Sequence, residues 1–94
     1  MRRFSHDDKG YRAWLTANPG GLVLNVRSVP DLKYVVLHRA SCHSISNDAQ
    51  PPDAFTGRAY RKICAFTEAE LTLAAKREGR SDGTFSKRCA RCKP

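Results

Sequence analysis

The stretch VLHRASCH (residues 36–43) governs the architecture of this chain, because an apolar run ends there in side chains that bind metals. Val36 and Leu37 belong to a strand-like run, His38 follows them directly, and Cys42 comes four residues later. A strand that turns sharply at its end can aim residues i and i+4 at one point. His38 and Cys42 are therefore candidate ligands of a single metal ion.

A second pair of candidate ligands lies near the end of the sequence, in Cys89-Ala90-Arg91-Cys92. Two thiolates separated by two residues can hold one tetrahedral ion from a tight turn, and this spacing is half of a zinc site. Together with His38 and Cys42 they make a closed set of four ligands. The sequence thus predicts a bound Zn²⁺ with a structural rather than a catalytic role.

The remaining cysteine leaves an alternative ligand set open. Cys64 lies in the strand-like run 59–66, where free cysteine is typical of a small buried hydrophobe. An all-cysteine site in which Cys64 replaces His38 is the main alternative arrangement. Two disulfides are the rival interpretation for a secreted chain, but Met1-Arg2-Arg3 is followed by Phe4-Ser5-His6-Asp7-Asp8, which contains no apolar leader region.

The 94 residues predict a single zinc-binding domain (1–94) of the α+β class. Its expected parts are an N-terminal helix, a three-stranded antiparallel sheet, a second helix and a C-terminal Cys-x-x-Cys knuckle. The helices are indicated by cap residues, namely Ser5 to Asp8 for the first and the capping-box pattern Thr67-Glu68-Ala69-Glu70 for the second. Apolar and β-branched runs indicate strands at 22–27, 33–38 and 59–66, and a polar loop is expected over 46–53.

The charge of the chain points to a polyanionic partner. Lys and Arg number 17 against 9 Asp and Glu, which gives a formal net charge of +8, and nucleic acid is the simplest partner for such an excess. Phosphate contacts from such residues would provide affinity without sequence choice. The candidate nucleic-acid-binding residues are Arg39, Ser41, His43, Arg58, Arg61, Lys62, Lys87, Arg88, Arg91 and Lys93.

Three segments carry a resemblance to a known family: HRASC (38–42), AAKREG (74–79) and RCARCKP (88–94). They resemble the Ada-type zinc-binding domain and the related small zinc domains appended to bacterial nucleases, over residues 36–42 and 69–94. The resemblance implies a zinc module that binds DNA. In the Ada repair proteins the first ligand is a cysteine that accepts a methyl group. Here His38 stands at that position, and an imidazole cannot take that thiolate role.

The function that these observations favour is a zinc-dependent DNA-binding module of bacterial origin. Its expected partner is duplex DNA, including modified DNA, and it would target a fused or associated nuclease in restriction or defence. A zinc-stabilised protein-interaction domain is the alternative. No enzyme is expected, because the acidic residues are scattered and form no catalytic constellation with His6, His38 or His43. No apolar run is long enough to span a membrane, so a cytoplasmic location is expected.

Overall fold

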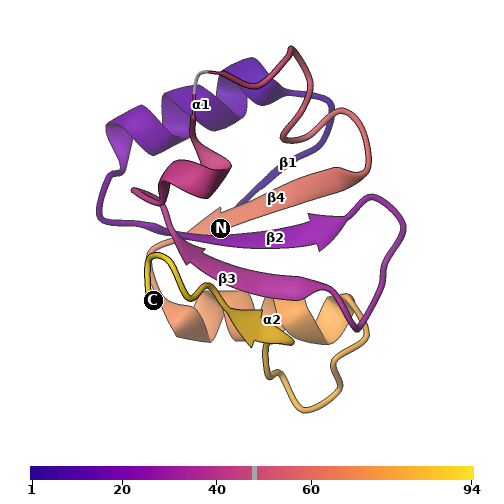
Figure 1. Cartoon of the computed structure of the whole chain (residues 1–94). Helices are drawn as coiled ribbons and strands as arrows, with labels where there is room; N and C mark the ends of the chain where they lie inside the picture. Colours follow the sequence, from indigo (N-terminus) through magenta and orange to yellow (C-terminus); the bar gives the residue numbers. More distant parts are fainter. Residues whose placement is uncertain (48) are drawn as a thin grey trace.

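The computed structural model describes residues 1–47 and 49–94, and its framework is one mixed sheet with a helix on each side (Figure 1). Asp48, which belongs to the predicted polar loop, lies outside the described residues. The strand order in the sheet is β1-β4-β2-β3-β5. The elements in chain order are β1 (Arg2–Phe4), α1 (Asp8–Ala17), β2 (Leu22–Arg27), β3 (Val35–Arg39), the 3₁₀ helix η1 (His43–Ile45), β4 (Tyr60–Ala65), α2 (Glu68–Arg77) and β5 (Lys87–Arg88).

The prediction of a three-stranded antiparallel sheet was wrong, although the α+β class and both helices are confirmed. The three predicted strands form the centre of the sheet as β2, β3 and β4, and two short edge strands complete it. β1 pairs antiparallel with β4, whereas β5 pairs parallel with β3, which makes the sheet mixed. A three-residue strand and a two-residue strand are too short to show the alternation by which a strand is recognised in a sequence.

The sheet is buried on both faces, and alternate residues of each strand belong to different cores. Val23 of β2 lies opposite His38 of β3 and Cys64 of β4, so these three side chains share the face that α1 covers. The next register position places Leu24 opposite Leu37 and Ile63 on the face that α2 covers. Coverage of both faces explains why the strands read as near-continuous apolar runs.

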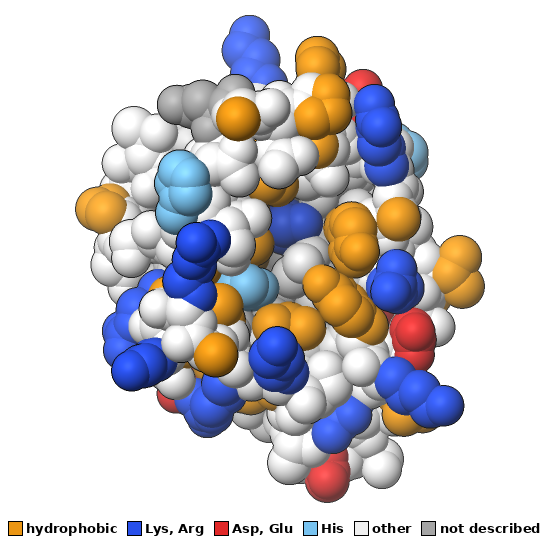
Figure 2. All heavy atoms as spheres, viewed as in Figure 1, with side chains coloured by type: hydrophobic (Ala, Val, Ile, Leu, Met, Phe, Trp, Pro, Cys, Tyr) orange, Lys and Arg blue, Asp and Glu red, His pale blue; other side chains and the backbone are white. Residues whose placement is uncertain are grey.

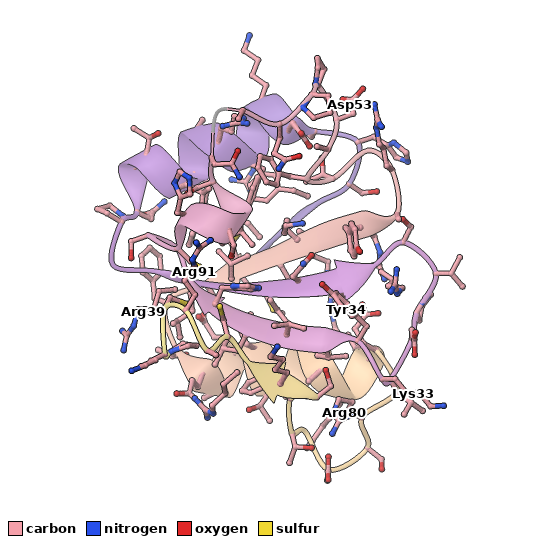
Figure 3. All side chains as sticks on the ribbon, viewed as in Figure 1. Lys33, Tyr34, Arg39, Asp53, Arg80 and Arg91 are labelled. Atoms are coloured by element: carbon pink, nitrogen blue, oxygen red, sulfur yellow. The ribbon has the colours of Figure 1, made fainter. Side chains whose placement is uncertain are left out.

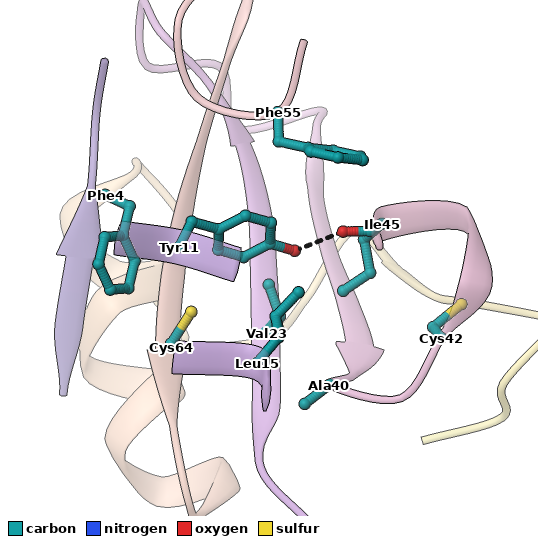
Figure 4. Packing of buried hydrophobic residues seen from close by; sticks show 9 residues of the cluster. All are labelled: Phe4, Tyr11, Leu15, Val23, Ala40, Cys42, Ile45, Phe55 and Cys64. Atoms are coloured by element: carbon teal, nitrogen blue, oxygen red, sulfur yellow. Dashed lines mark hydrogen bonds between the residues drawn. The ribbon is translucent and has the colours of Figure 1, made fainter. Parts of the chain in front are cut away.

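The core on the α1 side is built around Tyr11 (Figure 4). Its ring contacts the rings of Phe4 and Phe55, with centroids 6.0 and 5.7 Å apart. Its buried hydroxyl donates a 2.8 Å hydrogen bond to the carbonyl oxygen of Ile45. Helix α1 thereby holds η1, and with it the chain segment that follows His38, against the sheet.

The segment before β4 is fixed to the start of α1 by the side chain of Asp8. Its carboxylate accepts hydrogen bonds from the backbone N–H groups of Phe55 and Thr56 and from the hydroxyl of Thr56. Burial raises the pKa of this carboxyl, but these three donors and the nearby Lys62 outweigh it and lower the pKa. Phe55 is therefore positioned from two sides, by Asp8 and by Tyr11.

The predicted start of the second helix is confirmed, but the Glu70 half of the capping box binds the residue before the N-cap instead of the N-cap itself. Thr67 is the N-cap of α2, and its hydroxyl accepts a hydrogen bond from the backbone N–H of Glu70. The Glu70 carboxylate accepts from the N–H of Phe66, one residue before the cap. Within the described residues, none of the helices has the length and apolar content needed to cross a membrane.

Candidate metal centre and basic surface

The structure brings together the four predicted metal ligands His38, Cys42, Cys89 and Cys92. His38 is the second-last residue of β3, and Cys42 is the residue from which η1 begins. Cys89 directly follows β5, and its backbone N–H donates to the carbonyl oxygen of Leu37. The parallel pairing of β5 with β3 therefore carries the C-terminal knuckle to the end of β3, where the first pair of ligands lies (Figure 1).

The four candidate ligand atoms lie close enough together to share one metal ion. One nitrogen of His38 and the three sulfurs all lie within 4.8 Å of one another. The sulfurs of Cys42 and Cys89 are 3.9 Å apart. Two thiolates bound at about 2.3 Å to a tetrahedral metal are separated by about 3.8 Å. A disulfide needs about 2.05 Å, and all four cysteines are free.

The imidazole of His38 fits the part of a ligand on two further grounds. Its Nδ1 atom is buried and has no hydrogen-bond partner among the described residues. Buried polar atoms are nearly always satisfied, so such an atom calls for an explanation, and an ion that it binds is one. Burial, reinforced by the charges of Lys62 and Lys87, lowers the pKa of His38 to about 4. The ring is therefore neutral at pH 7, which is the form that binds metals.

The surroundings lower the pKa of the Cys89 thiol and raise the pKa of the Cys92 thiol. Partial burial acts to raise the pKa of Cys89, but hydrogen bonds from the backbone N–H groups of Cys92 and Arg91 hold it below its usual value. Burial and the neighbouring thiols raise the pKa of Cys92 to about 11. Sulfur ligands at such short separations favour a cation among them, since a bound metal keeps its thiolate ligands deprotonated.

Backbone and side-chain donors surround the cluster. The N–H of Arg39 lies 3.2 Å from the sulfur of Cys92, and the hydroxyl of Ser44 lies 3.0 Å from the sulfur of Cys42. The guanidinium of Arg39 donates to the carbonyl oxygens of Cys92 at 2.9 Å and Lys93 at 3.0 Å. Arg39 thus fastens the C-terminal knuckle to β3. The sequence offered no signal for this role, because it depends on a contact across more than 50 residues.

Cys64 lies apart from the four-residue group. Its side chain is fully buried in the core on the α1 side, together with Phe4, Tyr11 and Val23 (Figure 4). Burial raises the pKa of its thiol to about 12, so the thiol is protonated at neutral pH. The structure therefore favours the interpretation of Cys64 as a buried hydrophobe over the all-cysteine site.

Four of the predicted nucleic-acid-binding residues line a cavity beside the metal cluster. Arg39, Ser41, His43 and Arg91, with the candidate ligands Cys42 and Cys92, line an open pocket of about 440 Å³. Figure 3 shows Arg39 and Arg91 at the same end of β3. Lys87 and Lys93, also predicted, are exposed close in sequence to the candidate ligands Cys89 and Cys92. Lys and Arg side chains far outnumber acidic ones on the face seen in Figure 2.

Two other predicted residues, Arg61 and Arg88, form ion pairs within the chain. Arg61 donates to both carboxylate oxygens of the buried Glu78 and to the carbonyl oxygen of Arg27. Arg88 forms an ion pair with Glu68 on the exposed surface of α2. Lys62 is buried in the sheet, and Arg58 is exposed in the segment before β4. These bonds leave Arg61 and Arg88 with fewer donors for phosphate than their charge suggested.

Comparisons of the chain with protein-family models, with curated proteins and with solved structures found no match.

Proposed function

We propose that this chain is a zinc-dependent DNA-binding module. The ligand set of one imidazole and three thiolates is typical of structural zinc sites, since a closed tetrahedral arrangement of nitrogen and sulfur leaves no position for a substrate. Such an ion would hold the ends of β3 and β5 together and would contribute to folding rather than to a reaction. The Ada-type resemblance gives the same class of module.

The observation that carries the proposal is the basic cavity beside the metal cluster. Arg91 offers a guanidinium group, Arg39 keeps the donors that its bonds to Cys92 and Lys93 leave over, and Ser41 and His43 add hydrogen-bonding groups around the same volume. Guanidinium groups suit phosphate because they bind it through two parallel hydrogen bonds. The bonds from Arg39 to the knuckle tie the shape of this cavity to the integrity of the metal cluster.

Such a surface would bind the DNA backbone and leave sequence choice to another component. Arg39, Arg91, Lys87 and Lys93 are the basic residues at or beside the candidate metal centre, apart from Arg88, which is paired with Glu68. If each neutralises one phosphate, the slope of log affinity against log salt concentration should be about −3.6 for duplex DNA. Weak, general affinity of this kind suits a module that brings a fused or associated nuclease to DNA, as in restriction or defence.

The proposal is tested by fluorescence anisotropy with the zinc-loaded protein and short labelled duplexes across a range of salt concentrations. The panel includes single strands and duplexes with methylated or hydroxymethylated bases. Arg91→Ala removes one guanidinium from the cavity, and Arg77→Ala removes the same charge from the exposed end of α2 as a matched control.

We expect Arg91→Ala to weaken duplex binding several-fold and to reduce the salt slope by about 1, while Arg77→Ala changes neither appreciably. Equal effects of the two variants would show that net charge, not the cavity, governs binding. A flat salt response would contradict phosphate contact and favour a protein partner for the module.

A further inference from the structure

A groove crosses the polar half of the sheet on the α1 side, between the strands and the segment that contains η1. Two adjoining cavities of about 230 and 260 Å³ form it, and both are lined by Asn25, Tyr34, Ser44 and Ile45. Tyr60 and Lys62 line one cavity, and His38 and Lys87 line the other. Figure 2 shows a hollow in this face with basic side-chain atoms at its floor and hydrophobic side chains at its border. We call this feature the sheet groove.

The floor of the sheet groove holds a buried ammonium group. Lys62 is only 2% exposed, and its Nζ donates to the side-chain oxygen of Asn25 at 2.8 Å and to the carbonyl oxygen of Phe55 at 2.6 Å. An ammonium group has three hydrogens, and the acceptors in the described part of the chain take two of them. The third hydrogen has no oxygen acceptor among the described residues. The rings of Tyr11, Phe55 and Tyr60 lie 5.5 to 5.8 Å from Nζ, and an acceptor that enters the sheet groove can take this hydrogen.

No carboxylate forms a contact ion pair with Lys62 in the described residues, and Asp8 acts on its charge only from a longer distance. Among the described ion pairs none includes Lys62, and the nearby Asp8 gives its oxygens to Phe55 and Thr56. A buried charge without a paired ion is costly, and an apolar residue would fill the same space at lower cost. Such a group in a cavity is therefore a sign of a binding function.

One wall of the sheet groove consists of two tyrosine rings, and the opposite wall consists of residues that hydrogen bonds hold in place. The rings of Tyr34 and Tyr60 lie 5.5 Å apart, and Arg27 covers both rings at 4.7 and 5.4 Å. On the opposite side, Ile45 is held by the hydroxyl of Tyr11 and Phe55 is held by the carboxylate of Asp8. The sheet groove is thus formed before any ligand enters it.

These features select a flat ring that carries a carbonyl oxygen. An aromatic wall favours a planar ligand, and the third hydrogen of Lys62 can bind an acceptor. The cavity that Lys62 lines, of about 230 Å³, has room for one ring system rather than a larger molecule. We infer that the sheet groove receives a single nucleobase turned out of the DNA, with its carbonyl oxygen hydrogen-bonded to Lys62. This inference rests on the proposed function, because the DNA that supplies the base is held at the basic cavity.

A donor at the floor of the sheet groove favours bases that carry a ring carbonyl over adenine. Thymine, cytosine and guanine each carry a ring carbonyl, whereas adenine presents an amino group that would face the donor Lys62. A base leaves the duplex at lower cost when it is mismatched. Mismatches that free thymine, cytosine or guanine should therefore bind better than mismatches that free adenine, and thymine represents the carbonyl-bearing bases in the test.

The experiment compares matched duplexes with duplexes that contain one thymine or one adenine mismatch, each with 2-aminopurine beside the target base. Binding is followed by anisotropy, and extrusion is followed by the rise in 2-aminopurine fluorescence when stacking is lost. Lys62→Met removes the donor and keeps an unbranched side chain of similar length. Tyr34→Ala removes part of the aromatic wall and provides a second variant if Lys62→Met fails to fold.

We expect a roughly tenfold preference for the thymine mismatch over the matched duplex, with a fluorescence rise, because a hydrogen bond to a charged group is worth at least that factor. Both variants should lose the preference and the fluorescence rise while binding the matched duplex as before. Equal binding of all duplexes without a fluorescence change would overturn the inference and leave the proposed function intact. Failure to bind any duplex would overturn both.

Discussion

Replacing Arg61 with alanine should destabilise the fold by about 3 to 5 kcal/mol, which is the usual cost of leaving one partner of a buried ion pair alone. One guanidinium nitrogen of Arg61 lies 3.1 and 3.0 Å from the two carboxylate oxygens of Glu78. The side chain of Glu78 is 4% exposed, and Arg61 is 22% exposed. Arg3 lies 3.9 Å from the same carboxylate but is itself 38% exposed, so it can replace Arg61 only in part.

The measurement is urea unfolding of the metal-loaded protein, followed by circular dichroism, with Arg58→Ala as the control. Arg58 is an exposed basic residue three positions away, and its loss should change stability by less than about 0.5 kcal/mol. For a domain of this size, a loss of 3 kcal/mol lowers the melting temperature by about 12 to 24 °C. The double variant Arg61→Met with Glu78→Leu should recover much of the stability, since it removes both charges.

A loss below about 1 kcal/mol for Arg61→Ala would refute this reasoning, because the pair would then behave like one at the surface. The same variant separates two roles for Arg61. A structural role predicts a large loss of stability and little change in duplex affinity per folded molecule. A phosphate-binding role predicts the reverse.

Three further predictions concern the metal ligands and Lys62. A strong chelator should unfold the domain, because a structural metal contributes on the order of 10 kcal/mol to folding, and an unchanged melting curve would contradict this. His38→Ala should abolish stoichiometric zinc binding as measured by mass spectrometry, whereas Cys64→Ala should keep one zinc per chain. Burial lowers the pKa of Lys62 from 10.5 to about 8, so the folded chain releases this proton before the unfolded chain does, and stability should rise as the pH passes upward through about 8. In Lys62→Met this component of the rise between about pH 7.5 and 9 should be lost, and parallel pH dependences of the two proteins would show that Lys62 is not the cause.

The four residues of the candidate metal centre could be predicted from the sequence because each pair is local. His38 and Cys42 come from one strand end, and Cys89 and Cys92 come from one turn, so the spacing within each pair carries the information. What the sequence does not carry is the element that brings the pairs together. β5 contains two residues and pairs in parallel with β3, and a pairing of that length leaves no pattern of alternation.

The roles of the basic residues were harder to predict for a different reason. Arg61 and Lys62 are neighbours in β4 and read alike in the sequence, yet alternation places them on opposite faces of the sheet. Arg61 meets Glu78 at the end of α2, whereas Lys62 meets Asn25 and Phe55 on the α1 side. Charge in a sequence shows how many basic groups exist, but only the register of the sheet decides which partner each one finds.

The most direct test of the account is X-ray absorption spectroscopy at the zinc edge of the protein purified with zinc. The proposed ligands His38, Cys42, Cys89 and Cys92 predict one zinc per chain, with three sulfur neighbours at about 2.3 Å and one nitrogen at about 2.0 to 2.1 Å. Four sulfur neighbours would mean that Cys64 replaces His38. Absence of stoichiometric zinc, or a shell of oxygen and nitrogen without sulfur, would contradict the metal centre itself.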